Sequence, residues 1–371
     1  MRTHVDAESG ATPDGTQRFR DRFPDLPDHF RSQHGWWLSS IGIGTYLGSP
    51  DDDTDAAYVA AVQRAVERGI NVIDSAINYR CQRSERSIGR ALGLLFASGR
   101  ARRDEVVICT KGGYIPYEGS LPADPDRFIR ETYIDTAIAR PEDFVDGHCM
   151  SPEYLWHQLE QSRRNLGVEC VDVYYLHNPE TQLERIPRAQ FRARLRAAFE
   201  FLEERVDQGA IRFFGTATWN GYRVSPQASG YLSLDDVLAV AREVRGINHH
   251  CRFIQLPCNL ALLEALTLRN QRAGGEQMSV LEAAKRLGVT VICSASLLHS
   301  RLLGRIPDAL QAQFEGLSTD AQRAIQFARS APGVSSALVG MSRPEHVDDN
   351  VATARVPPLD ATAFKRLFAQ R

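Results

Sequence analysis

Short apolar segments alternate with longer amphipathic segments along most of the chain, and this alternation restricts the possible fold more than any other feature. The apolar segments are residues 41–45, 70–75, 105–111, 170–177, 210–218, 251–257, 289–296 and 335–340. The intervening segments, for example 55–69 and 191–209, place apolar residues at helical spacing, and several end in glycine, which often terminates a helix. Buried strands that alternate with amphipathic helices indicate βαβ units and a parallel sheet.

The number of predicted strands favours a closed barrel over an open sheet. Eight strands in a chain of 371 residues fit an α/β fold of the (β/α)8 TIM-barrel type. A doubly wound open sheet is the alternative, and it would need a glycine-rich phosphate loop after its first strand. Residues 42–48, GIGTYLG, lack the GxGxxG spacing of that loop. We therefore predict a single barrel domain over residues 31–371, preceded by a polar, flexible N-terminal arm at residues 1–30.

The composition argues against several classes of protein. The net formal charge is -2, so no excess of basic residues draws the chain to nucleic acid or to an anionic membrane. No apolar run reaches the roughly 18 residues that a membrane span needs, and the N-terminus lacks the apolar stretch of a secretory signal. The seven cysteines show no metal-ligand or redox spacing, which favours reduced thiols, a cytoplasmic location and no metal site. The oligomeric state stays open.

One long segment interrupts the alternation. Residues 112–151 separate the third predicted strand from the next predicted helix, and connections of this length are usually functional or disordered. The segment carries several aromatic residues, so we expect it to be ordered at least in part. Because it follows a strand, it belongs at the C-terminal face of the barrel, where active sites lie. We interpret it as an insertion that forms a lid on the substrate side, with His148 either a substrate contact or an ordinary loop histidine.

Four polar residues lie at or just beyond the ends of predicted strands. Asp74, Lys111 and His177 end three of the apolar segments, and Tyr79 follows Asp74 in the next loop. Since the C-terminal strand ends of a barrel meet at one face, we expect the four side chains to converge. Each residue alone also fits a structural role, such as a helix cap for the aspartate or packing for the tyrosine.

The types of these four residues suit the reduction of a carbonyl group. The carbonyl carbon gains a hydride and the oxygen gains a proton, and a phenol such as Tyr79 is a weak acid near neutral pH. The Lys111 ammonium would favour the phenolate and lower the pKa of Tyr79, while Asp74 would keep Lys111 charged and in place. His177 would orient the carbonyl oxygen by a hydrogen bond or share the proton.

The motifs IDSAINY, VVICTK and VYYLHNP, which contain these residues, resemble the core motifs of the aldo-keto reductases, and the resemblance extends from about Ser39 to Asn350. It implies a (β/α)8 barrel and carbonyl reduction with NADPH as the expected cofactor, with NADH left open as the alternative. It also implies Tyr79 as general acid/base, assisted by Lys111, Asp74 and His177. The cofactor contacts that we expect are Gly44, Thr45, Asp74, Thr218, Gln255, Ser294, Ser342, Arg343 and Asn350. Among these, Gln255 would bind the nicotinamide carboxamide, Ser342 and Arg343 the 2′-phosphate, and Asn350 the adenine.

Two positions depart from the family pattern. The Gly-Val-Ser-Asn that follows the fifth strand in the family reads Gly-Thr-Ala-Thr at residues 215–218, so Ala217 lacks a hydrogen-bonding side chain and Thr218 or Asn220 would have to replace it. Ser294 stands where the family often has a tyrosine that stacks on the nicotinamide, and Trp219 is a candidate to supply that stack. Both changes concern how the cofactor is held and leave the proton-donating residues intact.

Three functions fit the sequence to different degrees. The first is an NADP(H)-dependent enzyme that reduces an aldehyde or ketone, or oxidises the alcohol. The second is a nucleotide-binding barrel of low turnover that acts as a redox sensor or auxiliary subunit, which the changes at Ala217 and Ser294 would permit. The third is a metal-dependent hydrolase with Asp74 and His177 as ligands, which the charge of Lys111 disfavours. A polyol, a sugar and an aromatic aldehyde all stay open as the small-molecule substrate.

Overall fold

The protein is a closed barrel of eight parallel strands, described for residues 9–368 by a computed structural model. The strands follow one another around the barrel in the order β11, β12, β3, β4, β5, β6, β7 and β8, and β8 pairs with β11 to close it. Their bounds are β3 (Ile41–Gly44), β4 (Val72–Asp74), β5 (Val107–Gly112), β6 (Val171–His177), β7 (Ile211–Ala217), β8 (Cys251–Pro257), β11 (Thr290–Ser294) and β12 (Val334–Gly340). Each strand overlaps one predicted apolar segment, so the TIM-barrel prediction is confirmed.

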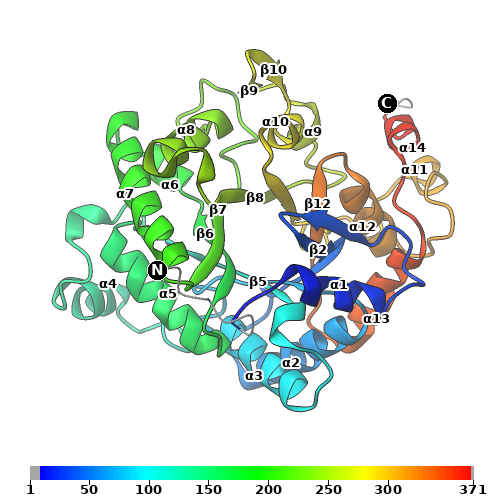
Figure 1. Cartoon of the computed structure of the whole chain (residues 1–371), viewed down its shortest axis with the longest axis horizontal. Helices are drawn as coiled ribbons and strands as arrows, with labels where there is room; N and C mark the ends of the chain where they lie inside the picture. The colour runs from blue at the N-terminus through cyan, green and yellow to red at the C-terminus, as the bar shows by residue number, and fades with distance from the viewer. Residues whose placement is uncertain (1–8, 369–371) are drawn as a thin grey trace.

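Helices surround the barrel strands (Figure 1). The longer ones are α2 (Asp52–Glu67), α3 (Arg83–Ala97), α5 (Pro152–Leu166), α7 (Arg188–Asp207), α8 (Leu234–Arg245), α10 (Val280–Leu287), α12 (Asp320–Ser330) and α13 (Pro344–Ala352). The shorter ones are α6 (Glu180–Leu183), α9 (Glu264–Thr267), α11 (Asp308–Gln311) and α14 (Ala361–Arg366). Local sequence explains the ends: the Ser279 hydroxyl accepts from the Glu282 amide at the start of α10, and left-handed Gly288 ends that helix.

The strands are apolar on both faces because each face packs against something different. On β6, Val173 and Tyr175 point into the barrel and belong to an interior cluster with residues such as Phe253. Tyr174 and Leu176 alternate with them and pack in the larger cluster between strands and helices. This double burial is the reason that the strands read as continuous apolar runs.

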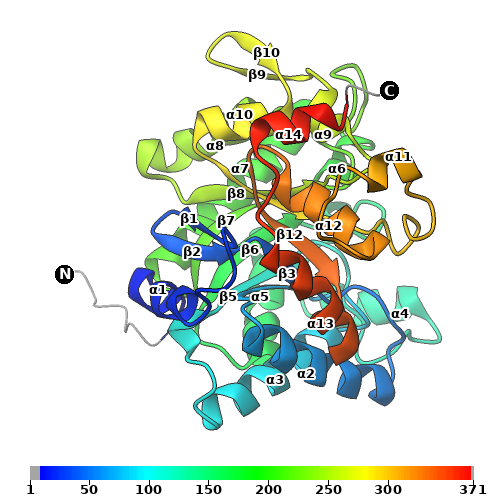
Figure 2. The same cartoon turned by 90° about the vertical axis from the view of Figure 1, so that its right-hand side faces the viewer.

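A hairpin and a helix close the end of the barrel at which the strands begin. Strand β1 (Phe30–Gln33) pairs with β2 (Trp36–Ser39), and the Trp36 ring lies 5.0 Å from that of Phe213 inside the barrel. Helix α1 (Pro13–Asp21) packs beside them, with Phe19 fully buried (Figure 2). We call this end the floor and the opposite end the mouth.

The flexible-arm prediction is wrong for residues 9–30, while residues 1–8 lie outside the described residues. The Ala11 amide donates to the Asp172 carboxylate at 2.7 Å, and the Arg18 guanidinium pairs with Asp104 at 2.6 Å. The polar residues that suggested disorder thus include some that form hydrogen bonds and an ion pair with the floor of the barrel. The start of the domain at residue 31 stays a prediction.

Between β5 and α5 the chain makes the long excursion that the sequence suggested. It contains α4 (Pro125–Ile129), a π turn at Arg130–Ile134 and a 3-10 turn at Pro141–Asp143. Its apolar side chains form a separate small cluster around Tyr133 and Tyr154, away from the barrel core. Figure 2 places α4 at the side of the molecule opposite α1. A second excursion, between α9 and α10, forms the hairpin β9 (Gln271–Ala273)–β10 (Glu276–Met278), which the sequence did not predict.

Candidate active site

The strand register brings the ends of the barrel strands to one rim. Gly44 pairs with Gly340 on one side and with Asp74 on the other, and Ala217 lies between His177 and Gln255. A cavity of about 440 Å³ opens at this rim. Its lining includes residues from the ends of β3, β4, β6, β7, β8, β11 and β12, so the cavity occupies the mouth.

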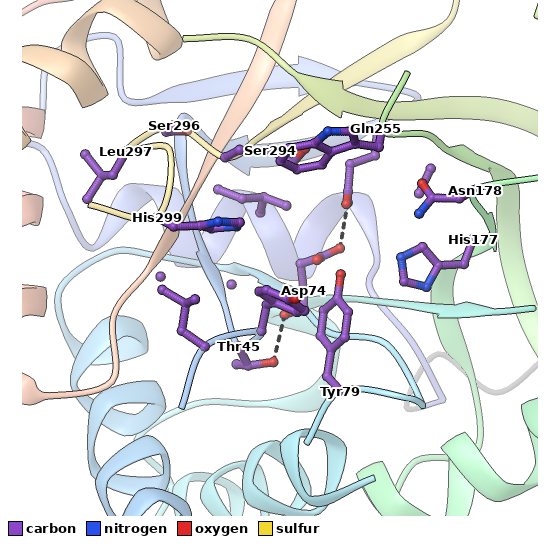
Figure 3. Close-up of a pocket in the computed structure, with 18 of the residues that line it drawn as sticks. Thr45, Asp74, Tyr79, His177, Asn178, Gln255, Ser294, Ser296, Leu297 and His299 are labelled. Atoms are coloured by element: carbon purple, nitrogen blue, oxygen red, sulfur yellow. Dashed lines mark hydrogen bonds between the residues drawn. The ribbon is translucent and has the colours of Figure 1, made fainter. Parts of the chain in front are cut away.

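A buried ion pair lies at the base of the cavity. The Lys111 Nζ donates to Asp74 Oδ1 at 2.5 Å and to the Ser75 carbonyl at 2.7 Å. The other Asp74 oxygen accepts from Gln255 Nε2 at 2.7 Å (Figure 3). Both charged side chains are almost inaccessible to water, so the ion pair and these hydrogen bonds must offset most of the cost of burying their charge.

Tyr79 is held over this pair by a strained loop. Lys111 Nζ lies 4.9 Å from the Tyr79 ring centroid. The next three residues, Arg80, Cys81 and Gln82, all adopt left-handed backbone angles, with φ of 47°, 54° and 71°. Such conformations cost on the order of 1 kcal/mol each for residues other than glycine, and they concentrate at functional sites. The loop that positions Tyr79 therefore has three consecutive residues in an energetically unfavourable backbone conformation.

His177 completes the predicted group of four, and the structure brings all four together. Its ring meets the Tyr79 ring edge-on at 5.7 Å, and Tyr114 meets it edge-on from the other side at 5.1 Å. Figure 3 shows the Tyr79 hydroxyl directed into the cavity beside the His177 ring. The His177 Nδ1 is buried without a partner among the described residues, which leaves Nε2 as the ring nitrogen available to the cavity.

The charges of the group follow from burial and from Lys111. Burial lowers the pKa of Lys111, but Asp74 and Tyr79 raise it more, so the ammonium stays protonated. Burial raises the pKa of Tyr79 above its ordinary value, and Lys111 opposes that rise only in part. Burial, with Lys111 and His148, holds the pKa of His177 well below its ordinary value.

The expectation that Lys111 lowers the pKa of Tyr79 is thus correct for the contribution of the lysine and wrong for the net shift. The physical reason is that complete burial disfavours the phenolate more than one ammonium favours it. At neutral pH the site holds a neutral phenol, a neutral imidazole and an ammonium. This arrangement is suited to donating a proton.

The residues expected to contact a cofactor fall into two groups. Gly44, Thr45, Asp74, Thr218, Gln255 and Ser294 all line the cavity. Ser342, Arg343 and Asn350 do not line it. The first two lie just beyond Gly340, at the start of α13, and Asn350 is buried within that helix. Asn220, the other candidate to replace the hydrogen bond missing at Ala217, also lies outside the lining.

Unpaired polar atoms in the wall indicate that the cavity suits a polar ligand. The Thr218 Oγ1, Ser296 Oγ and Asn78 Oδ1 atoms are buried and have no hydrogen-bond partner among the described residues. All three residues line the cavity. Gly44 also leaves space, because a Cβ built there would find no atom nearer than 3.8 Å. A nicotinamide with its carboxamide and ribose fits these features, although Gln255 Nε2 is already bound to Asp74.

Aromatic side chains form much of the cavity wall, and they include Trp219, which the sequence suggested as a stacking residue. The His299 ring stacks on Tyr46 at 5.6 Å and on Trp219 at 6.0 Å, which joins loops from three strands. Tyr114 and Asn178 also line the cavity. The signal for Asn178 was its place directly after His177. For Tyr114, nothing in the local pattern separated it from the other aromatic residues of the long segment.

The interpretation of residues 112–151 as a lid stays a prediction. Of that segment, only Tyr114 lines the cavity, and the remaining aromatic residues pack among themselves and against α5. His148 is fully buried and does not line the cavity, so the direct substrate contact considered for it is wrong.

Neither a metal cluster nor a membrane helix is found in the described part of the chain. Residues 9–368 contain no group of three histidine, cysteine or acidic side chains arranged to hold a metal ion. Within the same residues, no helix combines the length and the apolar character that a membrane crossing requires.

Comparisons with known proteins point to one family. The model of the Aldo/keto reductase family matches residues 40–240. The chain is 24% identical over 336 residues to the D-threo-aldose 1-dehydrogenase of a Pseudomonas species, covering 85% of this chain and 87% of that protein. It is 23% identical over 273 residues to the aldo-keto reductase AFTS1 of Alternaria alternata, covering 71% of this chain and 63% of that protein. The chain therefore spans less than two thirds of the length of this second relative.

A solved structure with a similar fold is the aldo/keto reductase of Klebsiella pneumoniae in complex with NADP and acetate. The TM-score is 0.61 at 20% sequence identity, and the match covers 93% of this chain and 95% of that chain. At this identity the likeness concerns the fold.

Proposed function

The chain belongs to the aldo/keto reductase family, and from this premise we propose that it is an NADP(H)-dependent oxidoreductase that reduces an aldehyde or ketone, or oxidises the matching alcohol. The observation that carries the proposal is the placement of Tyr79 and His177 over the buried Lys111–Asp74 pair at the cavity. An acid, a group that stabilises its conjugate base and an orienting imidazole are the parts that carbonyl reduction needs from the protein.

Two sets of residues would hold the cofactor. Thr218, Ser294 and Ser296 offer hydroxyl groups at the cavity wall for the nicotinamide end. Ser342 and Arg343 lie at the start of α13, where the helix N-terminus and a guanidinium favour a phosphate such as the 2′-phosphate of NADP. Asn350 in the same helix would contact the adenine. When bound, the reduced nicotinamide supplies the hydride that adds to the carbonyl carbon.

In the reduction, Tyr79 donates its hydroxyl proton to the carbonyl oxygen. The phenolate that this leaves is stabilised by the Lys111 ammonium, which Asp74 and the Ser75 carbonyl hold in position. A neutral His177 with its proton on Nε2 donates a hydrogen bond to the same oxygen and so orients the carbonyl group. The phenolate regains its proton from solvent, and the reverse reaction uses the phenolate as the base.

The cavity favours an uncharged substrate with an aromatic or apolar body. No lysine or arginine lines it among the described residues, so a phosphorylated or carboxylated substrate would find no cation there. The rings of Tyr46, Tyr114, Trp219 and His299 instead present flat apolar faces and polar edges. Of the three substrate classes that the sequence left open, we propose the aromatic aldehyde.

The cysteines bear on the cellular compartment. All seven are buried free thiols in the described structure. We propose a reducing compartment, the cytoplasm, for the protein.

The first prediction tests the general acid. Tyr79→Phe keeps the ring that packs between Tyr46 and His177 but removes the proton, so kcat for NADPH-dependent reduction should fall by about 10²- to 10⁴-fold. NADPH affinity, measured by fluorescence titration, should stay within about twofold of the wild type. Because burial raises the pKa of Tyr79 above 10, wild-type reduction should persist through neutral pH and decline only above that value, whereas alcohol oxidation should rise with pH.

Unchanged turnover in Tyr79→Phe would exclude this mechanism. A wild-type protein that binds NADPH but turns over none of a panel of aromatic, aliphatic and sugar aldehydes would instead support the auxiliary-subunit interpretation.

A further inference from the structure

His148 lies directly behind His177, in the second half of the long segment between β5 and α5. It is fully buried, and it pairs with Tyr114 across the base of that segment. It contributes nothing to the cavity lining. Most aromatic residues of the segment pack away from the barrel, whereas His148 is buried next to the site.

The hydrogen bonds of His148 determine its tautomer. His148 Nε2 lies 2.8 Å from the main-chain carbonyl oxygen of His177, which can only accept, so Nε2 carries the proton. Burial lowers the pKa of His148 to about 4, so the ring is neutral and Nδ1 is an acceptor. Gln182 Nε2 lies 3.2 Å from that Nδ1 and donates to it. The Gln182 orientation is set in turn by Arg194 Nη1, which donates to Gln182 Oε1 at 3.0 Å.

Ring contacts give a second connection from His148 to the site. The His148 ring meets Tyr114 edge-on at 5.2 Å, and Tyr114 meets His177 in the same way at 5.1 Å. His177 then meets Tyr79 at 5.7 Å. Each interplanar angle is between 76° and 85°, so four rings follow one another edge to face. Both the main chain and the ring of His177 are therefore in contact with the His148 network.

The backbone of the segment accommodates this arrangement. Gly113 has φ of +140°, and a Cβ built on it would lie 2.5 Å from His148 Nε2. The Cys149 amide donates to the Gly113 carbonyl at 2.9 Å, which holds the beginning and the end of the segment together at this point. A glycine is required here because the His148 ring occupies the space of a side chain.

We propose that His148 is a positioning residue for His177, and that through it the segment 113–151 sets the placement of the imidazole that orients the carbonyl oxygen. The inference rests on the proposed function, since it concerns the rate of that reaction. In this proposal the buried part of the segment supports His177 from the side away from the cavity. The sequence had suggested instead that the segment covers the cavity as a lid. A displacement of His177 of the order of 1 Å would cost roughly 10²-fold in rate.

The test compares two replacements of His148. His148→Gln keeps a donor that reaches the His177 carbonyl and an acceptor for Gln182, whereas His148→Leu keeps most of the volume and loses both. We expect kcat for aldehyde reduction to fall about 10- to 100-fold in His148→Leu and to return to within about threefold of the wild type in His148→Gln. NADPH affinity should stay within about twofold in both, because His148 does not touch the cavity.

A matched control separates positioning from loss of stability. His29 is also fully buried, and its two ring nitrogens lie within hydrogen-bond distance of Gly69 O and Ser40 Oγ, but at the floor. His29→Leu should lower the melting temperature as His148→Leu does and leave kcat unchanged. Equal kcat in the two leucine variants, or a glutamine variant as slow as His148→Leu, would overturn the proposal.

If His148→Leu does not fold, Gln182→Met provides the second variant. It removes the donor to His148 Nδ1 one step further from the site, and kcat should fall at least threefold with NADPH affinity unchanged. Wild-type kcat in Gln182→Met would contradict the proposal. Failure of the proposed function is distinguishable, since it would appear as full turnover in Tyr79→Phe.

Discussion

The floor and the mouth of the barrel each hold a buried carboxylate, and the two carboxylates are used in different ways. At the floor, Asp172 accepts from the main-chain amides of Ala11 and Ile108 at 2.7 and 2.8 Å, and from Arg103 Nη2 at 2.8 Å. At the mouth, the partners of Asp74 among the described residues are side chains, those of Lys111 and Gln255. The floor carboxylate connects separate segments of the chain by hydrogen bonds. The mouth carboxylate instead positions side chains at the cavity and raises the pKa of Lys111.

The partners of the two carboxylates distinguish a buried polar group with a structural role from one with a functional role. Asp172 has main-chain partners on both oxygens, so its role ends with holding the N-terminal segment to β5 and β6. Near Asp74, the hydroxyl groups of Thr218 and Ser296 are buried without a partner among the described residues, and both residues line the cavity. Unpaired buried polar groups cost stability, and a ligand in the cavity would pair these two.

The largest difference that we expect between floor and mouth separates the two carboxylates directly. Asp74→Asn and Asp172→Asn each break a buried ion pair, so each should lower the free energy of unfolding by about 3 kcal/mol. Only Asp74→Asn should also slow carbonyl reduction per folded molecule, by on the order of 10²-fold, because Lys111 loses the partner that keeps it charged. Urea unfolding and steady-state kinetics on the same preparations check both parts. A comparable loss of activity in Asp172→Asn would remove the distinction between floor and mouth.

The next effect concerns His29 at the floor. Burial lowers the pKa of His29 from 6.5 to about 3, so the unfolded chain binds the proton more tightly than the folded one. The contribution of His29 to the free energy of unfolding is therefore fully present above pH 6.5, and it is lost as the pH falls toward 3. Linkage gives a loss of about 2 kcal/mol by pH 5.

His29→Gln cannot take up that proton. The difference in unfolding free energy between pH 7 and pH 5 should be smaller in this variant than in the wild type by about 2 kcal/mol. Urea denaturation at the two pH values measures it, and kcat should not change. An identical pH dependence in variant and wild type would mean that His29 is not buried as the structure has it.

The smallest effect concerns tryptophan. Trp219 at the mouth stacks on His299 beside the cavity, and Trp36 lies inside the floor. Trp219→Leu should weaken NADPH binding by about 2- to 10-fold, the size of one aromatic contact, and should remove most of the fluorescence change on titration. Trp36→Phe should keep the affinity and the response. Loss of the response in Trp36→Phe instead would place the nucleotide elsewhere.

Much of the mouth was predictable because strands have a simple sequence signature. Asp74, Lys111 and His177 each end an apolar run, and the C-terminal ends of parallel strands in a barrel meet by topology alone. Loop residues carry no such signature. Tyr46, Tyr114 and His299 belong to three different loops, and nothing local indicates that their rings meet around one cavity.

The N-terminal segment that covers the floor was predicted least well, for a related reason. Residues 9–30 are polar enough to suggest disorder, yet Ala11 and Arg18 find partners that lie far along the chain. Asp172, a charged residue within an otherwise apolar strand, was the one signal that a buried polar contact existed there.

The sequence by itself determined the barrel, its strands and the convergence of Lys111, Asp74 and His177, because periodicity and strand ends are local properties of the chain. Tyr79 lies in a loop, and the IDSAINY motif was what assigned it to the same group. The tertiary structure alone decided the protonation of Tyr79, since burial from all sides outweighs the one neighbouring ammonium. It also decided the place of His148, which lies 29 residues from His177 along the chain but within hydrogen-bond distance of its carbonyl. Both depend on what packs around a group in three dimensions, and no pattern of neighbours in sequence records that.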